Sequence, residues 1–302
     1  MPYREVIDTV DYKKEVVFHI PAVFSGISYD IDDYIYGVLQ KPSIVRDNVK
    51  FAVYGCPQGC IWNGGRYIGG EVLQMDYINR VLSNFAQTIG CMFQFTFTNT
   101  ELKEMDVYDR FGNALLKEAD RLSGTGNIEV LVASPILEEY IRSEYPRIKI
   151  ARSIVQATKP SPDLFEKYST IVVPIKYNRD LEYIKNFAEN ANGGCVEMLV
   201  DEHCSMECPR RVTHYQSYNQ ATLYEYPKQS LSCTTDNHRM IPIWVIEPEE
   251  LNDYIDLGVT HFKLSGREEL SHFIETAVYY MCRKKEQFYI RQQLYRMMKH
   301  WL

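Results

Sequence analysis

Signatures of several protein classes are missing from this sequence. No apolar run reaches the roughly 18 residues that a membrane-spanning helix needs, and the charged start from Met1 to Glu5 does not resemble a secretory signal. The chain also lacks a Gly-x-Ser-x-Gly elbow, a His-Glu-x-x-His helix and a P-loop. We therefore expect a cytoplasmic protein with no membrane segment. Peptidase chemistry would have no standard nucleophile or zinc site here.

An excess of positive charge is absent as well. The 302 residues include 33 Lys and Arg against 40 Asp and Glu, which gives a net charge of -7. This balance argues against broad nonspecific nucleic-acid binding, although it leaves room for a local basic groove. The 23 tyrosines are unusual, and they are explained by amphipathic packing on helix surfaces or by a cavity or interface.

Short apolar, β-branched or aromatic runs recur along the chain. Continuous runs of this kind are typical of parallel strands that are covered on both faces. The candidate strands are residues 51–54, 92–97, 128–133, 148–154, 171–175, 195–200, 241–246 and 261–264.

Helical patterns lie between most of these runs. Residues 78–89 and 270–281 each carry an apolar stripe at helical spacing, and Pro135 stands where the first turn of another helix begins. Strands that alternate with helices predict a parallel sheet, and eight of them predict a (β/α)8 TIM-like barrel, regular or irregular. An open doubly wound α/β sheet is the alternative.

Three segments stand outside this repeat. Residues 1–50 precede the first candidate strand and are predicted to form an N-terminal extension or lid on a barrel of residues 51–285. Residues 201–240 form a long insertion after the sixth candidate strand, where barrel enzymes keep their chemistry. Residues 286–302 are predicted to form a terminal helix for docking or oligomerisation.

Cysteines gather in two loops. Cys204 and Cys208 are separated by three residues within the insertion, and Cys233 follows them. Cys56 and Cys60 have the same spacing directly after the first candidate strand. In a barrel both loops would lie on the same rim, so their thiolates could converge on one metal centre. In a cytoplasmic protein, eight cysteines indicate thiols or metal ligands rather than disulfides.

The spacing leaves the kind of centre open. A [4Fe–4S] cluster usually needs four Cys ligands, while zinc would accept the same set or substitute His203 or His214. Radical S-adenosylmethionine chemistry is disfavoured, because the third position of its Cys-x3-Cys-x2-Cys pattern holds Asn63 or Arg211. The remaining cysteines are predicted to be buried and inert: Cys91, Cys195 and Cys282.

Charged residues supply further site candidates. Glu197 lies in an otherwise apolar strand, where a buried carboxylate is costly unless it is paired. His203 and His214 flank the cysteines and are candidates for proton transfer. Candidate substrate- or anion-binding residues are Arg66, Arg211, Lys263 and Arg267. The alternative for the arginines is a solvated turn or pairing with a neighbouring acid.

Two stretches carry a family resemblance. Residues 195–215 combine Glu197, a Cys-x3-Cys-Pro-Arg loop and His214-Tyr215, and residues 246–267 end in Phe-Lys-Leu-Ser-Gly-Arg. With residues 128–153, they resemble the collagenase-like peptidase family. The resemblance covers roughly residues 50–285. The chain departs from the family pattern at Ser265, where an acid usually precedes Gly-Arg, and in its cysteine spacing.

The resemblance implies a barrel related to the TIM fold and a [4Fe–4S] cluster on four cysteines. Several family members are implicated in oxygen-independent hydroxylation of quinone precursors or RNA bases, and others are described as collagenase-like proteases. The cysteine arrangement resembles the hydroxylase branch. The implied ligands are Cys204, Cys208, Cys233 and Cys60, with Cys56 as the alternative to Cys60.

Three functions follow as expectations. The leading one is an iron–sulfur hydroxylase or related oxidoreductase that acts on a small aromatic or RNA-base substrate. The second is a collagenase-like protease. The third is a non-catalytic, metal-stabilised subunit that binds a sister protein or a second copy of the chain.

Overall fold

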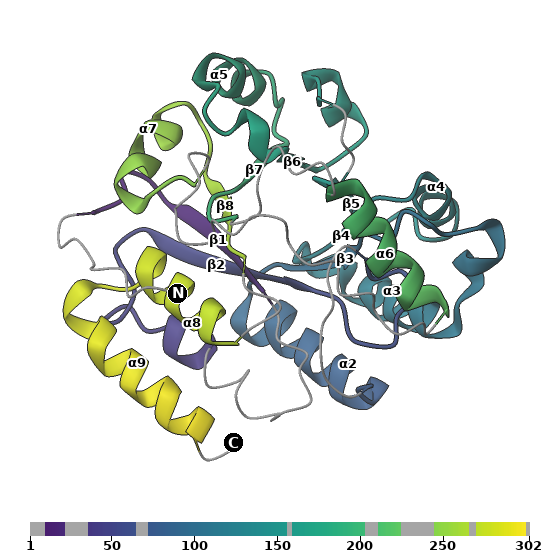
Figure 1. The fold of residues 1–302 in the computed structure, drawn as a ribbon, viewed down its shortest axis with the longest axis horizontal. Helices are drawn as coiled ribbons and strands as arrows, with labels where there is room; N and C mark the ends of the chain where they lie inside the picture. The colour runs from purple at the N-terminus through teal and green to yellow at the C-terminus, as the bar shows by residue number, and fades with distance from the viewer. Residues whose placement is uncertain are drawn as a thin grey trace.

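Eight parallel strands close into a single barrel, as the sequence predicts (Figure 1). The computed structural model describes residues 10–21, 36–64, 72–155, 159–202, 211–224, 245–265 and 270–299. Each strand pairs with its neighbour in the chain, and pairing of the first strand with the last closes the barrel. The (β/α)8 prediction is confirmed, and the doubly wound alternative is excluded.

The strands are short, as is usual in this architecture. They are β1 Val16–Pro21, β2 Val49–Gly55, β3 Phe93–Phe97, β4 Ile128–Val132, β5 Lys149–Arg152, β6 Thr170–Val173, β7 Cys195–Leu199 and β8 His261–Lys263. In the register of the closing pair, Val17 lies beside His261 and His19 beside Lys263.

The N-terminal prediction was wrong in one respect. Strand β1 lies within residues 1–50, which we assigned to an extension or lid, so the barrel starts before residue 51. The insertion therefore follows the seventh strand. Of the candidate strand at 241–246, only Val245 and Ile246 are described, and they are not in a strand. Both are buried, and Ile246 donates its N–H to the Val200 carbonyl beyond the end of β7, at 2.8 Å.

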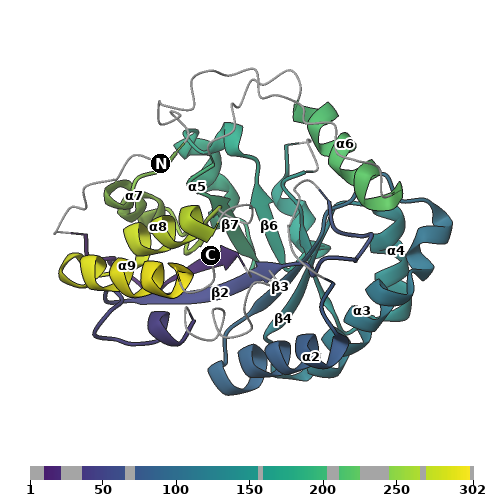
Figure 2. The ribbon, with the colours of Figure 1, turned by 60° about the horizontal axis from the view of Figure 1, so that its bottom comes forward.

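Helices surround the strands (Figure 2). They are α2 Met75–Ser83, α3 Arg110–Leu122, α4 Pro135–Glu144, α5 Leu181–Glu189, α6 Arg211–Tyr224, α7 Leu251–Asp256, α8 Leu270–Met281 and α9 Lys284–Lys299. A π-helical turn, Asn84–Ile89, extends α2. Side-chain caps start several of them, because Asp109, Ser134 and Asp180 accept the otherwise unpaired N–H groups of a first turn.

The C-terminal prediction concerns α9. The helix starts at Lys284 and continues to Lys299, and the last residues of the chain lie outside the described part. Within the described residues, no helix has the length and apolar character that crossing a membrane needs.

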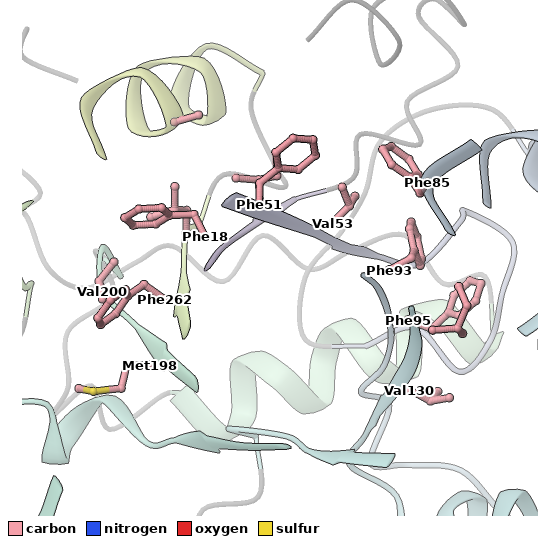
Figure 3. Packing of buried hydrophobic residues seen from close by; sticks show 14 of the residues in the cluster. Phe18, Phe51, Val53, Phe85, Phe93, Phe95, Val130, Met198, Val200 and Phe262 are labelled. Carbon is pink, nitrogen blue, oxygen red and sulfur yellow. The ribbon is translucent and has the colours of Figure 1, made fainter. Parts of the chain in front are cut away.

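The hydrophobic core lies between the outer faces of the strands and the helices. Figure 3 shows aromatic side chains from β1, β2, β3 and β8 in this layer, among them Phe18, Phe93 and Phe262. A second, small apolar cluster is separate from it and consists of Leu131, Ala151 and Val172, from β4, β5 and β6. Because side chains alternate along a strand, these residues and the polar ones near them belong to the inner face.

One tryptophan fixes the cysteine loop after β2. Trp62 is fully buried, donates its indole N–H to the Asp106 carbonyl at 2.8 Å and meets Phe97 edge to face. Gly112, near the start of α3, lies directly under the ring. A Cβ at that position would come within 2.6 Å of the indole carbons, so only glycine leaves room for Trp62.

We therefore expect Gly112→Ala to lower the free energy of unfolding, even though Ala is favoured over Gly in a helix by about 1 kcal/mol. Chemical denaturation of the two proteins measures the difference. Gly124→Ala is the control, because a Cβ there meets nothing within 4 Å. A Gly112→Ala protein as stable as the Gly124→Ala protein would contradict the packing described for Trp62.

Candidate functional site

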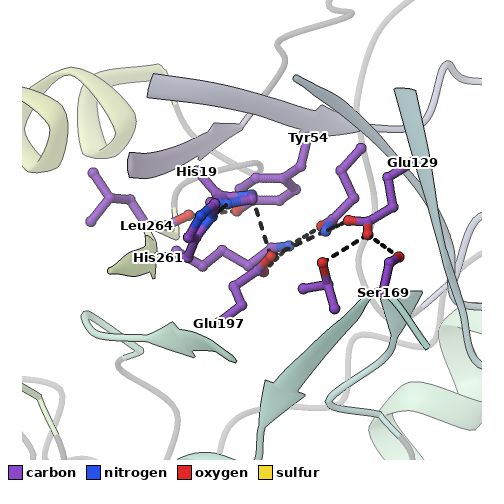
Figure 4. Close-up of polar contacts among 10 residues, drawn as sticks. His19, Tyr54, Glu129, Ser169, Glu197, His261 and Leu264 are labelled. Atoms are coloured by element: carbon purple, nitrogen blue, oxygen red, sulfur yellow. Dashed lines mark hydrogen bonds and ion pairs between the residues drawn. The ribbon is translucent and has the colours of Figure 1, made fainter. Parts of the chain in front are cut away.

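The barrel interior holds a cluster of polar side chains where such barrels usually have branched apolar ones (Figure 4). We call this cluster the polar core. Its members are His19 of β1, Gln94 of β3, Glu129 of β4, Thr170 of β6, Glu197 of β7, and His261 and Lys263 of β8. All are buried except His261, which is partly exposed.

An ion pair lies at its centre. The Lys263 ammonium donates to Glu197 Oε1 at 2.7 Å and to Gln94 Oε1 at 2.6 Å. The Gln94 amide nitrogen donates to Glu197 Oε2 at 3.1 Å. The three side chains therefore form a closed ring of hydrogen bonds, in which each charge has its partner. Two charges can remain buried when they are paired and hydrogen-bonded in this way.

Gln94 joins this ion pair to a second carboxyl group. Its nitrogen also donates to Glu129 Oε2, at 2.9 Å. The other Glu129 oxygen accepts the hydroxyls of Ser169 and Thr170, at 2.6 and 2.7 Å. Burial raises the pKa of Glu129 in spite of these hydrogen bonds. We infer that Glu129 takes up a proton far more readily than Glu197.

The environment of Glu197 has the opposite effect. Burial would raise its pKa, but His19, Lys263 and the Gln94 amide stabilise the ionised form and lower the pKa to about 2. Two carboxyl groups bridged by one amide thus have pKa values pushed apart. A separation of this kind is what assigns acid and base roles in active sites.

Two histidines extend the polar core. His19 Nε2 lies 2.9 Å from His261 Nδ1, and His19 Nδ1 lies 3.3 Å from Glu197 Oε2 without good hydrogen-bond geometry. Burial lowers the pKa of His19 to about 3, although Glu197 opposes this. Burial also lowers the pKa of His261. Both rings are therefore neutral at physiological pH.

The carboxyl ends of the strands lie above this core. The Lys263 ammonium sits 4.1 Å from the centre of the Tyr54 ring, and the Tyr54 hydroxyl donates to the Leu264 carbonyl. Asp201, just after β7, accepts the Ser265 N–H at 2.7 Å and the Ser265 hydroxyl at 3.0 Å. These hydrogen bonds connect the loop after β7 to the loop after β8 at Ser265, the residue before the Gly266-Arg267 pair of the sequence.

The first cysteine loop is described in part. Cys56 and Cys60 are both buried after β2 and contact the hydrophobic core. Gly64, further along the loop, accepts a hydrogen bond from Thr98, and a Cβ on Gly64 would overlap Asn219 and the backbone of Asn99. The loop after β2 is thus packed against the loop after β3 and against α6.

Helix α6 belongs to the cysteine-bearing insertion. Asn99 donates its side-chain amide to the Asn219 carbonyl at 3.3 Å, and the Asn219 amide donates to Thr100 at 2.9 Å. On the same helix, the predicted site residue His214 stacks on Tyr218, with 4.7 Å between the ring centres. The insertion therefore docks on the carboxyl ends of β2 and β3.

Other predicted residues cannot be placed in this way. Arg211 is the first residue of α6, but its side chain lies outside the described part. Also outside it are Arg66, His203, Cys204, Cys208, Cys233 and Arg267. Within the described residues, no group of three or more His, Cys, Asp and Glu side chains is arranged for a metal ion. The predicted metal ligands and anion-binding arginines remain predictions.

Three cysteines lie away from the first cysteine loop. Burial raises the pKa of Cys91 and of Cys282 to about 12. Burial and the nearby Glu197 raise the pKa of Cys195 as well. All three are neutral thiols at physiological pH, as expected for structural cysteines.

Sequence reasoning identified Glu197 and Lys263 but missed the five other members of the polar core. These are His19, Gln94, Glu129, Thr170 and His261. The available signal was a polar residue at an inward position of an apolar strand, as in Phe93–Phe97 around Gln94. The signal becomes informative only when strand register shows that these positions face one another.

Comparison with known proteins supports the fold alone. No protein-family model and no curated protein matches the chain. A solved structure of the U32 peptidase Mk0906 superimposes with a TM-score of 0.52 at 14% sequence identity, over 88% of this chain and 98% of that one. The chain therefore shares its barrel architecture with a U32 peptidase.

The polar core makes stability depend on pH. An unfolded His19 binds a proton below about pH 6.5, whereas the folded one stays neutral down to about pH 3. Stability is therefore lost as the pH falls through this window. Glu197 adds a second loss between about pH 4.5 and 2.

We expect the His19→Asn protein to have a lower free energy of unfolding at neutral pH than the unmodified protein. Its free energy of unfolding should fall less between pH 7 and pH 5, because it lacks the buried imidazole. Denaturation series at several pH values test this, and equal slopes for both proteins would refute it.

Proposed function

We propose that this chain is a cytoplasmic barrel enzyme with a [4Fe–4S] cluster at the carboxyl end of its strands. Its reaction would be an oxygen-independent hydroxylation or a related redox conversion of an aromatic or nucleobase substrate. The observation that carries the proposal is the docking of the cysteine-bearing insertion on the first cysteine loop, through α6.

This docking supports convergence of the two cysteine-bearing loops. Cys60 lies four residues before Gly64, which is packed against Asn219. Cys208 lies three residues before Arg211, where α6 begins. At 1.5 Å per residue, the start of α6 is about 12 Å from Asn219 along the helix. We propose that Cys204 and Cys208 approach Cys60 from the segment before α6.

The surroundings of the described thiols suit a cluster. Cys56 and Cys60 are buried together with Trp62 at the edge of the hydrophobic core. Thiolates are the ligands that iron–sulfur clusters require. We propose Cys60, Cys204, Cys208 and Cys233 as the ligand set, with Cys56 as the alternative to Cys60 and zinc as the alternative metal. A bound cluster would supply electron transfer to the site.

The chain itself would supply binding and electrostatics. The Lys263 ammonium, held by Glu197 and Gln94, would stabilise negative charge on a substrate at the mouth. We propose Arg66, Arg211 and Arg267 as partners for anionic parts of the substrate. His203 and His214 would transfer protons there.

Peptide hydrolysis is the second candidate, since the similar solved structure is described as a U32 peptidase. It predicts peptide cleavage that survives loss of the cysteines. Failure of both activities, with a partner protein that co-purifies, would favour the third reading, a non-catalytic subunit.

Anaerobic purification followed by iron, sulfide and zinc analysis tests the cluster. We expect about four irons and four sulfides per chain, as a [4Fe–4S] cluster requires. Absorbance near 400 nm should accompany them. The double variant Cys204→Ser and Cys208→Ser is expected to lose iron and colour. Cys60→Ser should do the same while Cys56→Ser retains them; the reverse outcome would assign the fourth ligand to Cys56.

Cys91→Ser is the matched control, because Cys91 precedes β3 at the opposite end of the barrel. It should keep the full complement of iron. Stoichiometric zinc, or no metal in protein purified anaerobically after expression with added iron, would refute the cluster. Trials with aromatic compounds, RNA and peptides then separate the candidate substrates.

A further inference from the structure

We propose that His261, His19, Glu197 and Lys263 form a proton relay along the barrel interior. It would connect solvent at the amino-terminal end of β8 with the Lys263 ammonium near the carboxyl end. The inference goes beyond the proposed function, because it concerns the polar core and needs no cluster.

The four residues lie on three adjacent strands. β8 pairs with both β7 and β1, and the register sets Glu197 beside His261 and His19 beside Lys263. His261 and Lys263 are two residues apart and face the same way. At about 3.3 Å per residue, the relay spans about 7 Å along β8.

Exposure distinguishes the ends of this path from its middle. His261, the first residue of β8, is partly exposed. The Lys263 side chain retains 8% of its accessible surface, whereas the side chains of His19 and Glu197 retain none. Protons can therefore enter and leave at the ends, while the two middle residues are protected from water.

The resting positions of the protons follow from Glu197. An ionised carboxylate has only lone pairs to offer, so we infer that His19 Nδ1, which lies 3.3 Å from Glu197 Oε2, carries a hydrogen. A small rotation of the ring would align this N–H for donation, because the present contact is not a hydrogen bond. His19 Nε2 is then an acceptor, and its partner His261 Nδ1 must be the donor across 2.9 Å. His261 Nε2 keeps a lone pair. Both rings are thus fixed as Nδ1–H tautomers.

This arrangement permits a balanced transfer. Lys263 gives one proton to a basic substrate atom and keeps the electron pair of that N–H bond. A proton then passes from His19 Nδ1 through Glu197 to the Lys263 amine. His19 Nε2 takes the Nδ1 proton of His261, and His261 Nε2 takes a proton from water. One proton enters and one leaves, and no electrons are transferred.

Both rings end this transfer protonated on Nε2. In the reverse direction, Lys263 passes a proton through Glu197 to His19 Nδ1, His19 Nε2 returns its proton to His261 Nδ1, His261 Nε2 releases its proton to water, and the Lys263 amine takes a proton from the reaction product. This restores the original tautomers. The relay therefore fits a reaction in which one substrate atom first takes up a proton and another later gives one back. Gln94 is a positioning residue, because its amide holds both Glu197 and Lys263.

Nuclear magnetic resonance of the nitrogen-15-labelled full-length protein tests the tautomers first. We expect both His19 and His261 to be protonated on Nδ1, with His19→Gln and His261→Gln used to assign their signals. A His19 ring protonated on Nε2 would overturn the proposal by itself, because no proton would then lie between His19 and Glu197.

Hydrogen exchange at the Lys263 ammonium tests the transfer. Its signal is assigned with Lys263→Arg, and its exchange with solvent is measured at fixed pH. A relay predicts that exchange is several-fold slower in His261→Gln than in the unmodified protein. Glu15→Gln, which removes a surface contact with Lys50, should leave the rate unchanged.

The direction of the effect separates a relay from a structural role. A substitution that merely loosens the barrel would speed exchange, since water would reach Lys263 more easily. Equal or faster exchange in His261→Gln therefore overturns the relay. The partly exposed His261 is the preferred site for this test, because its replacement disturbs the fold less than replacement of His19. Repeating the measurement with Cys204→Ser keeps the result independent of the cluster.

Discussion

The ion pair between Lys263 and Glu197 is the constraint on which the barrel interior depends. Two charges can stay inside a barrel only if they are paired and hydrogen-bonded. Gln94 of β3 hydrogen-bonds both partners, and His19 of β1 lies 3.3 Å from the Glu197 carboxylate. The pair therefore fixes four strands relative to one another. Removal of either partner would leave the other buried and uncompensated, at a cost of roughly 3–5 kcal/mol.

Much of the fold was predictable because parallel strands that are covered on both faces have continuous apolar sequences. The runs near 128–133 and 195–200 are of this kind and became β4 and β7. Strand β1 was missed because His19 and Pro21 interrupt its apolar run. Of the run at 241–246, the described residues Val245 and Ile246 are buried but lie outside any strand. Burial of Ile246 against the end of β7 requires apolar residues without requiring strand pairing.

The candidate site was less accessible to prediction. Glu197 stood out because a charge within an apolar strand is costly, and Lys263 because it ends a strand just before a Gly-Arg turn that suits an anion. His19 and Gln94 did not, since neutral polar residues occur widely in strands. Their importance depends on barrel closure, which brings β1 against β8 across more than two hundred residues of sequence. The low pKa of Glu197, which sets it apart from Glu129, likewise depends on His19 and Lys263, which only the three-dimensional arrangement brings to it.

The hydrogen bonds between Asp201 and Ser265 have an evolutionary consequence. Ser265 stands where the resembling family usually has an acid, and in this chain both its N–H and its hydroxyl point to the Asp201 carboxylate. An acid at 265 would set two carboxylates against each other, so the two positions are expected to change together among homologues. Asp paired with Ser would then mark one lineage of the barrel, and a different residue at 201 would accompany the lineages that keep the acid.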